Sequence, residues 1–166
     1  MTVAPAPKPF PVGWEELHRN AKALAWRLLE LGPWTGLVGV SRGGLVPAAI
    51  VARELDIRQV ETVSIMSYGP DDSRPRQAAA ASVINAPTRI GDGTGWLVVD
   101  DLVDTGRTAG VIRELFPKAH LATVYAKPLG RPMVDTFVTE VSQDTWIYFP
   151  WDVELQFIQP IASRDR

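Results

Sequence analysis

The feature that most constrains this chain is the stretch at residues 96–109, which reads Trp-Leu-Val-Val-Asp-Asp-Leu-Val-Asp-Thr-Gly-Arg-Thr-Ala. Its apolar beginning is typical of a buried strand, and its end leads into a helical pattern. Three carboxylates, those of Asp100, Asp101 and Asp104, lie between the two. Free N–H groups at a helix N-terminus bind phosphate, and carboxylate oxygens bind hard cations. The stretch therefore predicts a site for a sugar phosphate with a metal ion.

Each part of this stretch has its own expected role. Asp100 and Asp101 should end the strand and, being consecutive, should point to opposite faces of the sheet. Mg²⁺ commonly binds one or two carboxylates together with phosphate oxygens and water. The N–H groups of residues 105–109 have no partners within the helix, so they and the nearby threonine hydroxyls can hold a phosphate. Gly106 allows the backbone to approach it closely.

Two other interpretations fit parts of the same residues. Asp104 or Thr105 could simply cap a helix while Asp100 and Asp101 face water, but the Val-Val-Asp-Asp that precedes the turn disfavours this. The Asp-Asp-x-x-Asp pattern also occurs in isoprenoid synthases, where it sits on helices of all-helical proteins. A strand-like run before it and a glycine after it argue against that class here.

Strand and helix patterns alternate through the chain, which predicts an α/β fold with a mainly parallel sheet. The expected helices are residues 14–31, 45–55 and 106–116, and the expected strands are residues 36–40, 59–68, 96–101, 120–125 and 136–141. Ligands of such sheets bind at the carboxyl ends of the strands. Residues 41–44, residues 100–108 and Lys127 all follow strands, so we expect them to converge on one cleft.

Length and composition set the remaining bounds. The 166 residues predict one domain at residues 13–166, preceded by a loose proline-rich tail at residues 1–12. Residues 69–95 form a long segment that should be functional or disordered. A net charge of −2 does not favour nucleic acid, and the absence of cysteine excludes thiolate metal sites. No apolar run approaches the roughly 20 residues of a membrane helix, so a cytoplasmic protein is expected.

Four segments together resemble one family. Residues 98–109 are similar to the phosphoribosyl-pyrophosphate motif of type I phosphoribosyltransferases. Residues 40–47, residues 126–132 and residues 144–152 look like segments of the bacterial xanthine-guanine members, in the same order. The resemblance covers about residues 14–161. It implies the type I phosphoribosyltransferase fold, a mainly parallel twisted sheet flanked by helices, with residues 69–95 as a mobile hood loop.

The resemblance also implies an activity, the Mg²⁺-dependent transfer of ribose 5-phosphate from 5-phosphoribosyl 1-pyrophosphate to a 6-oxopurine. Asp104 would be the catalytic residue, as a general base or as an electrostatic stabiliser near the purine N7. Asp101 and Asp100 would bind the metal. The peptide after Ser41 is often cis in this family. The residues implied to bind the phosphoribosyl donor are Ser41, Arg42, Gly43, Gly44, Arg74, Asp100, Asp101, Asp104, Thr105, Gly106, Arg107 and Thr108, with Arg76 as an alternative to Arg74.

The purine side of the site is implied by four further residues. Lys127 would donate to the 6-oxygen, Trp146 would stack on the ring, and the Ile147 backbone would meet the 2-substituent. Asp152 would assist there or at a second metal. Taken alone, Lys127 reads as a surface lysine and Trp146 reads equally well as core packing. Residues 148–149 are Tyr-Phe where the family often has polar residues, which leaves the order of guanine, xanthine and hypoxanthine open.

Partners and rival functions complete the expectations. The family implies small-molecule substrates and a homo-oligomer that is a tetramer or a dimer. It also implies a cytoplasmic location, with a peripheral association with the inner membrane. The rival from another class is a regulatory protein of this fold that binds a nucleotide effector. Such a protein is expected to show a basic face and often an added binding domain. The net charge of −2 and the lack of space for a second domain argue against it. Lys127 with Trp146 argues against adenine or orotate as the acceptor.

Overall fold

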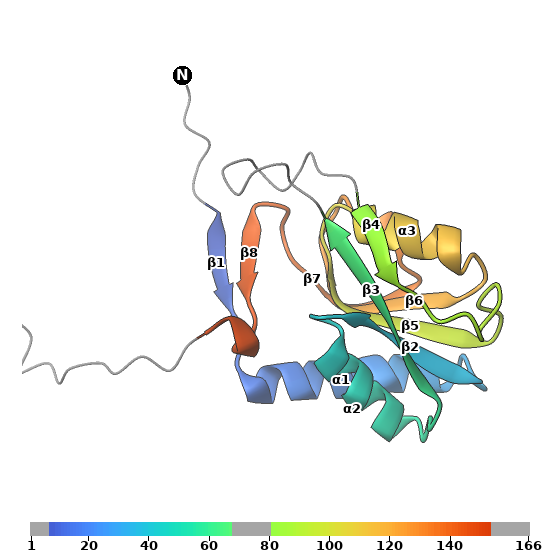
Figure 1. Cartoon of the computed structure of the whole chain (residues 1–166). Coiled ribbons are helices and arrows are strands. Elements are labelled where there is room, and N and C mark those ends of the chain that lie inside the picture. The colour runs from blue at the N-terminus through green and yellow to red at the C-terminus, as the bar shows by residue number, and fades with distance from the viewer. Residues whose placement is uncertain (1–6, 68–80, 154–166) are drawn as a thin grey trace, which may run out of the picture.

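A six-stranded sheet forms the centre of the computed structural model, which describes residues 7–67 and 81–153 (Figure 1). The strands lie in the order β4-β3-β2-β5-β6-β7, and every neighbouring pair is parallel except β3 with β4. Their bounds are β2 Gly36–Ser41, β3 Val60–Ser67, β4 Ala81–Asn85, β5 Trp96–Val103, β6 His120–Ala126 and β7 Thr136–Glu140. The expected α/β fold with a mainly parallel sheet is confirmed.

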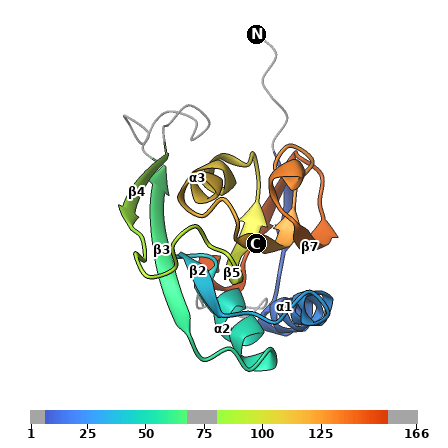
Figure 2. The same ribbon diagram turned by 90° about the vertical axis from the view of Figure 1, so that its right-hand side faces the viewer.

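Helices cover both faces of this sheet. α1, Trp14–Leu29, and α2, Leu45–Glu54, lie on one face, and α3, Arg107–Leu115, lies on the other (Figures 1 and 2). The central strand β5 is buried on both faces, which explains why it begins as a continuous apolar run rather than an alternating one. The two faces give two apolar clusters, one under α1 and α2 and one under α3.

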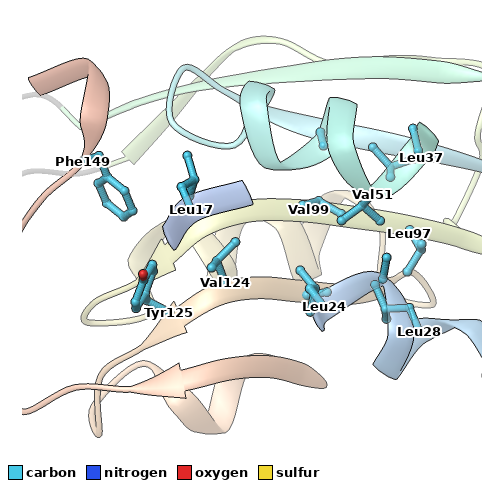
Figure 3. Close-up of a cluster of buried hydrophobic side chains, with 14 of the residues drawn as sticks. Leu17, Leu24, Leu28, Leu37, Val51, Leu97, Val99, Val124, Tyr125 and Phe149 are labelled. Atoms are coloured by element: carbon cyan, nitrogen blue, oxygen red, sulfur yellow. The ribbon is translucent and has the colours of Figure 1, made fainter. Parts of the chain in front are cut away.

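The larger cluster fixes α1 on the sheet. Leu17, Leu24 and Leu28 recur at helical spacing, are fully buried, and meet strand side chains such as Leu97 and Val124 (Figure 3). Burying one such side chain stabilises the fold by about 1.5–3 kcal/mol. Of the side chains labelled in Figure 3, only that of Tyr125 carries a polar atom, and its hydroxyl accepts a hydrogen bond of 2.9 Å from the Asn20 amide.

The prediction of a loose tail at residues 1–12 is wrong for residues 8–11. Lys8–Pro11 form β1, which pairs in parallel with β8, Thr145–Tyr148, beside the main sheet (Figure 1). The alternating prolines are compatible with this pairing because the residues between and after them supply the N–H donors of the hydrogen bonds to β8. The N–H of Lys8 donates to the Asp144 carbonyl and that of Val12 to the Tyr148 carbonyl, both at 2.9 Å. A strand with one bonded edge tolerates proline wherever its N–H is not needed.

The expected long loop at residues 69–95 is also partly wrong, because its second half contains β4. Ala81–Asn85 pairs antiparallel with β3 at the edge of the sheet. Arg74 and Arg76 lie outside the described residues, so the hood loop and its arginine stay predictions. A third difference is smaller. β5 runs to Val103, so Asp100 and Asp101 lie within the strand rather than at its end.

The environment of His120 gives a testable dependence of stability on pH. Its half-buried ring lies 5.3 Å from the Trp34 ring, and its Nε2 is 2.8 Å from Thr136 Oγ1. Burial lowers the pKa of His120 below its ordinary value, although Asp135 opposes the effect. The unfolded chain therefore binds the proton more readily, and stability is lost as the pH falls below the ordinary histidine range. The free energy of unfolding, measured with urea, should fall less between pH 7 and pH 5 for His120→Gln than for the unsubstituted protein.

The exposed His18 supplies the matched control for this experiment. His18→Gln should keep the pH dependence of the unsubstituted protein. Identical pH dependence in His120→Gln and the unsubstituted protein would contradict the account of a proton excluded by burial.

Candidate active site

The candidate site lies where the order of the parallel strands reverses. From β2 the chain passes through α2 to its neighbour β3, and from β5 it passes through α3 to β6 on the other side. Ligands of open α/β sheets bind at such a switch point, outside the carboxyl ends of the strands. Residues 41–44, residues 104–106 and Lys127 follow the adjacent strands β2, β5 and β6. The structure thus brings the three expected segments to one edge of the sheet.

The loop after β2 packs directly on β5. A Cβ placed on Gly43 would lie 2.2 Å from Asp101 Oδ2, so only glycine permits this approach. Ser41 Oγ is 2.7 Å from Ser64 Oγ on the neighbouring strand β3, which holds the start of the loop. The Ser41–Arg42 peptide is cis, as the family resemblance implied, and the Arg42 side chain is exposed.

The loop after β5 forms one wall of a cavity of about 220 Å³. Gly106 has a φ of +87°, in the left-handed region, and α3 begins at the next residue. The wall includes Thr105 and Thr108, and the floor is formed by Asp100 and Thr123 among others. Thr123 Oγ1 is buried and has no hydrogen-bond partner within the described residues. A helix N-terminus with two hydroxyls suits a phosphate group.

Asp100 and Asp101 form an electrostatically costly pair. Burial, followed by the charge of Asp101, raises the pKa of Asp100 well above its ordinary value. Burial also raises the pKa of Asp101 to about 6, and the charge of Asp152 adds to this. A divalent cation would relieve the repulsion, and its preferred ligands are carboxylate oxygens. The pair therefore fits Mg²⁺.

No group of three or more candidate metal-binding side chains is found in residues 7–67 and 81–153. Mg²⁺ beside phosphates usually binds one or two carboxylates and takes its other ligands from substrate and water, and the pair Asp100 and Asp101 suits that arrangement.

The Asp104 carboxylate is held from two sides. Lys127 Nζ lies 3.3 Å from Asp104 Oδ2, and the Gln143 amide nitrogen donates to Asp104 Oδ1 at 2.8 Å. The Lys127 side chain is only 5% exposed, whereas that of Asp104 is 50% exposed. A lysine that comes directly after a buried strand is thus an interior cation rather than a surface one. Asp104 is fixed in place and still faces solvent.

A second cavity, of about 580 Å³, is also lined by Asp104. Its walls include Lys127 and Trp146, and Trp146 is 46% exposed on β8. Pro7, just before β1, also lines it. Asp104 lines both this cavity and the cavity of about 220 Å³ at the loop after β5. One carboxylate therefore borders both a space suited to a phosphate and a space with a cation and an indole ring.

The roles predicted for the Ile147 backbone and for Asp152 stay predictions. The Ile147 side chain is 6% exposed and packs in the larger core cluster, and Ile147 is absent from the described lining of the second cavity. Asp152, in the short helix Pro150–Asp152, accepts a hydrogen bond of 3.1 Å from the Phe149 N–H. Its charge adds to the raised pKa of Asp101.

Sequence reasoning missed several residues of the second cavity, among them Gln143 and Pro7. Gln143 immediately precedes the Asp-Thr-Trp-Ile segment, and that position was the only signal that could have drawn attention to it. Pro7 could not be anticipated, because its position depends on the pairing of β1 with β8.

No described helix is long and apolar enough to cross a membrane.

Comparison with known proteins identifies the family of this chain. A model of the phosphoribosyl transferase domain matches residues 13–158. A solved purine phosphoribosyltransferase from Pyrococcus horikoshii superposes with a TM-score of 0.72 at 27% identity, covering 92% of this chain and 99% of that one. The xanthine-guanine-hypoxanthine phosphoribosyltransferase of Helicobacter pylori shares the fold, with a TM-score of 0.71 at 24% identity and coverage of 87% and 94%. The chain belongs to the phosphoribosyltransferase family.

Sequence relatives narrow the family further. The xanthine-guanine phosphoribosyltransferase of Nitratidesulfovibrio vulgaris is 59% identical over 157 residues, which cover 95% of this chain and 93% of that protein. The protein of the same name from Cereibacter sphaeroides is 56% identical and covers 97% of each chain. The chain is thus similar over nearly its whole length to the xanthine-guanine members of the family.

Proposed function

We propose that this protein transfers ribose 5-phosphate from 5-phosphoribosyl 1-pyrophosphate to a 6-oxopurine, guanine or xanthine before hypoxanthine, and releases pyrophosphate. The observation that carries the proposal is that the two cavities adjoin and that Asp104 is the carboxylate lining both of them. The reaction needs a donor site and an acceptor site that meet at the ribose C1 atom. A fixed carboxylate at that junction can stabilise positive charge on the ribose as the bond to pyrophosphate breaks.

On the donor side, the loop after β5 would hold the 5-phosphate through its N–H groups and the hydroxyls of Thr105 and Thr108. Residues 41–44 would hold the pyrophosphate, with Arg42 supplying positive charge. Asp100 and Asp101 would bind the ribose hydroxyls and Mg²⁺, which neutralises charge on the leaving pyrophosphate when it is bound.

On the acceptor side, the interior ammonium of Lys127 suits a carbonyl oxygen, which accepts hydrogen bonds, and not the amino group of adenine, which donates them. Trp146 would stack on the purine ring. Because the purine loses a proton as its nitrogen attacks, a carboxylate within reach is useful as the base, and Asp104 fills that role. We propose contacts of the Ile147 backbone and Asp152 with the base only as secondary ones.

The wider setting is part of the proposal. A user of free purines and a phosphoribosyl donor works in the cytoplasm in a salvage role, and the family resemblance supports a homo-oligomer, a tetramer or a dimer. The rival function, a regulatory protein that binds a nucleotide effector, gains no observation of its own from the site. Lys127 held beside Asp104 is costly to keep buried without a substrate that uses it.

An assay with four purines tests the proposal. The protein, Mg²⁺ and 5-phosphoribosyl 1-pyrophosphate are mixed with guanine, xanthine, hypoxanthine or adenine, and nucleotide is measured by chromatography. We expect nucleotide from guanine and xanthine, less from hypoxanthine and a negligible amount from adenine. No nucleotide from any oxopurine would refute the enzymatic function, and adenine as the best acceptor would refute the role of Lys127.

A further inference from the structure

We infer that Gln143 is a positioning residue for Asp104, an inference that rests on the proposed function. Gln143 lies between β7 and β8 and donates its side-chain N–H to Asp104 Oδ1 at 2.8 Å. The same nitrogen lies 3.5 Å from the Asp104 backbone carbonyl. The Gln143 amide thus reaches both the side chain and the backbone of the residue proposed to carry the chemistry.

The other end of the same amide fixes its orientation. Gln143 Oε1 accepts a hydrogen bond of 3.0 Å from the Leu129 N–H, two residues after Lys127. Because a backbone N–H can only donate, the oxygen must face Leu129 and the nitrogen must face Asp104. Gln143 therefore joins the turn after β6 to the loop after β5 and presents a donor to the carboxylate.

Asp104 needs this second partner because Lys127 has to serve two groups. In the structure Lys127 Nζ lies 3.3 Å from Asp104 Oδ2. When a 6-oxopurine is bound, the same ammonium must also donate to the purine oxygen. Gln143 keeps the carboxylate in place during that exchange, and as a neutral donor it leaves the negative charge of Asp104 intact. That charge is what stabilises the cationic ribose.

The hydrogen-bond direction gives a test that separates positioning from mere tethering. Gln143→Leu removes both hydrogen bonds. Gln143→Glu keeps an acceptor for the Leu129 N–H but turns a carboxylate toward the Asp104 carboxylate. If Gln143 positions Asp104, we expect both variants to lower kcat about tenfold while the KM for 5-phosphoribosyl 1-pyrophosphate changes less than about twofold. Gln59→Leu, an exposed position before β3, is the matched control.

A double-mutant cycle with Asp104→Ala completes the test. If Gln143 acts through Asp104, then Gln143→Leu should lower kcat by less than about twofold in the Asp104→Ala background. A tenfold loss that persists in that background, or a normal kcat for Gln143→Glu, would overturn the inference. Normal turnover by Asp104→Ala would instead refute the proposed role of Asp104, so the two failures are distinguishable.

A measurement that needs no turnover guards the inference further. The side-chain amide resonances of Gln143 in nitrogen-15 spectra should shift in Asp104→Ala. They should stay in place in the control Asp92→Ala, because the Asp92 carboxylate pairs with Lys118, at 2.8 Å, and not with Gln143. Unshifted Gln143 resonances in Asp104→Ala would show that the hydrogen bond does not form in solution, and would overturn the inference whatever the assays show.

Discussion

Asp104→Asn should lower kcat by about a hundredfold or more while the protein stays folded. The substitution keeps the shape of the side chain and an oxygen that can accept the Gln143 hydrogen bond of 2.8 Å. It removes the negative charge and the ability to take a proton, both of which the proposed transfer needs at the junction of the two cavities. Steady-state kinetics with guanine and circular dichroism measure the two quantities.

Asp135→Asn is the matched control for this substitution. Asp135 is likewise paired with a cation, with 2.7 Å between its Oδ2 atom and Arg113, but it is not among the residues that line either cavity. It should keep normal turnover. Normal turnover by Asp104→Asn, with the protein folded, would contradict the catalytic role of the carboxylate.

Lys127→Met should lower kcat/KM for guanine by about a hundredfold, because a hydrogen bond from a buried cation to the purine oxygen is lost. The preference for guanine over adenine should fall with it. The apo protein should unfold at the same or a higher temperature, since a flexible apolar side chain replaces an ammonium that is 5% exposed. Assays with both purines and a thermal melt measure these effects.

Lys118→Met is the control for Lys127→Met. Lys118 pairs with Asp92 at 2.8 Å on the surface, where its side chain is 67% exposed. It should leave both kcat/KM values unchanged. An unaltered ratio of guanine to adenine in Lys127→Met would contradict the assignment of Lys127 to the purine oxygen.

The sequence predicted the strand, turn and helix of the proposed donor half well because local chemistry determines them. An apolar strand, an acidic turn and a glycine before a helix are contiguous at residues 96–109, and the structure forms that strand, turn and helix. The lengths of the elements were less predictable. The register of β5 with β6 carries the strand on to Val103, past the point where the carboxylates suggested an end.

The acceptor half depends on contacts between distant segments and was harder to predict. Gln143 meets Asp104 across 39 positions of sequence, and no periodicity reports such a contact. β1 looked like a loose tail because prolines alternate there, but pairing with β8 needs only the donors of the intervening residues. Lys127 taken alone reads as a surface lysine, and its place after a strand beside the other motifs is what predicted a site role; its burial beside Asp104 had no signal of its own.

A crystal structure of the protein with guanine, Mg²⁺ and an unreactive carbocyclic analogue of 5-phosphoribosyl 1-pyrophosphate tests the central claim most directly. We expect the 5-phosphate at the N-terminus of α3, the guanine oxygen in hydrogen-bond contact with Lys127, and the Asp104 carboxylate between the ribose and the base. Guanine bound away from Lys127 and Trp146, or an analogue whose ribose does not reach Asp104, would contradict the claim that one carboxylate joins the two halves of the site.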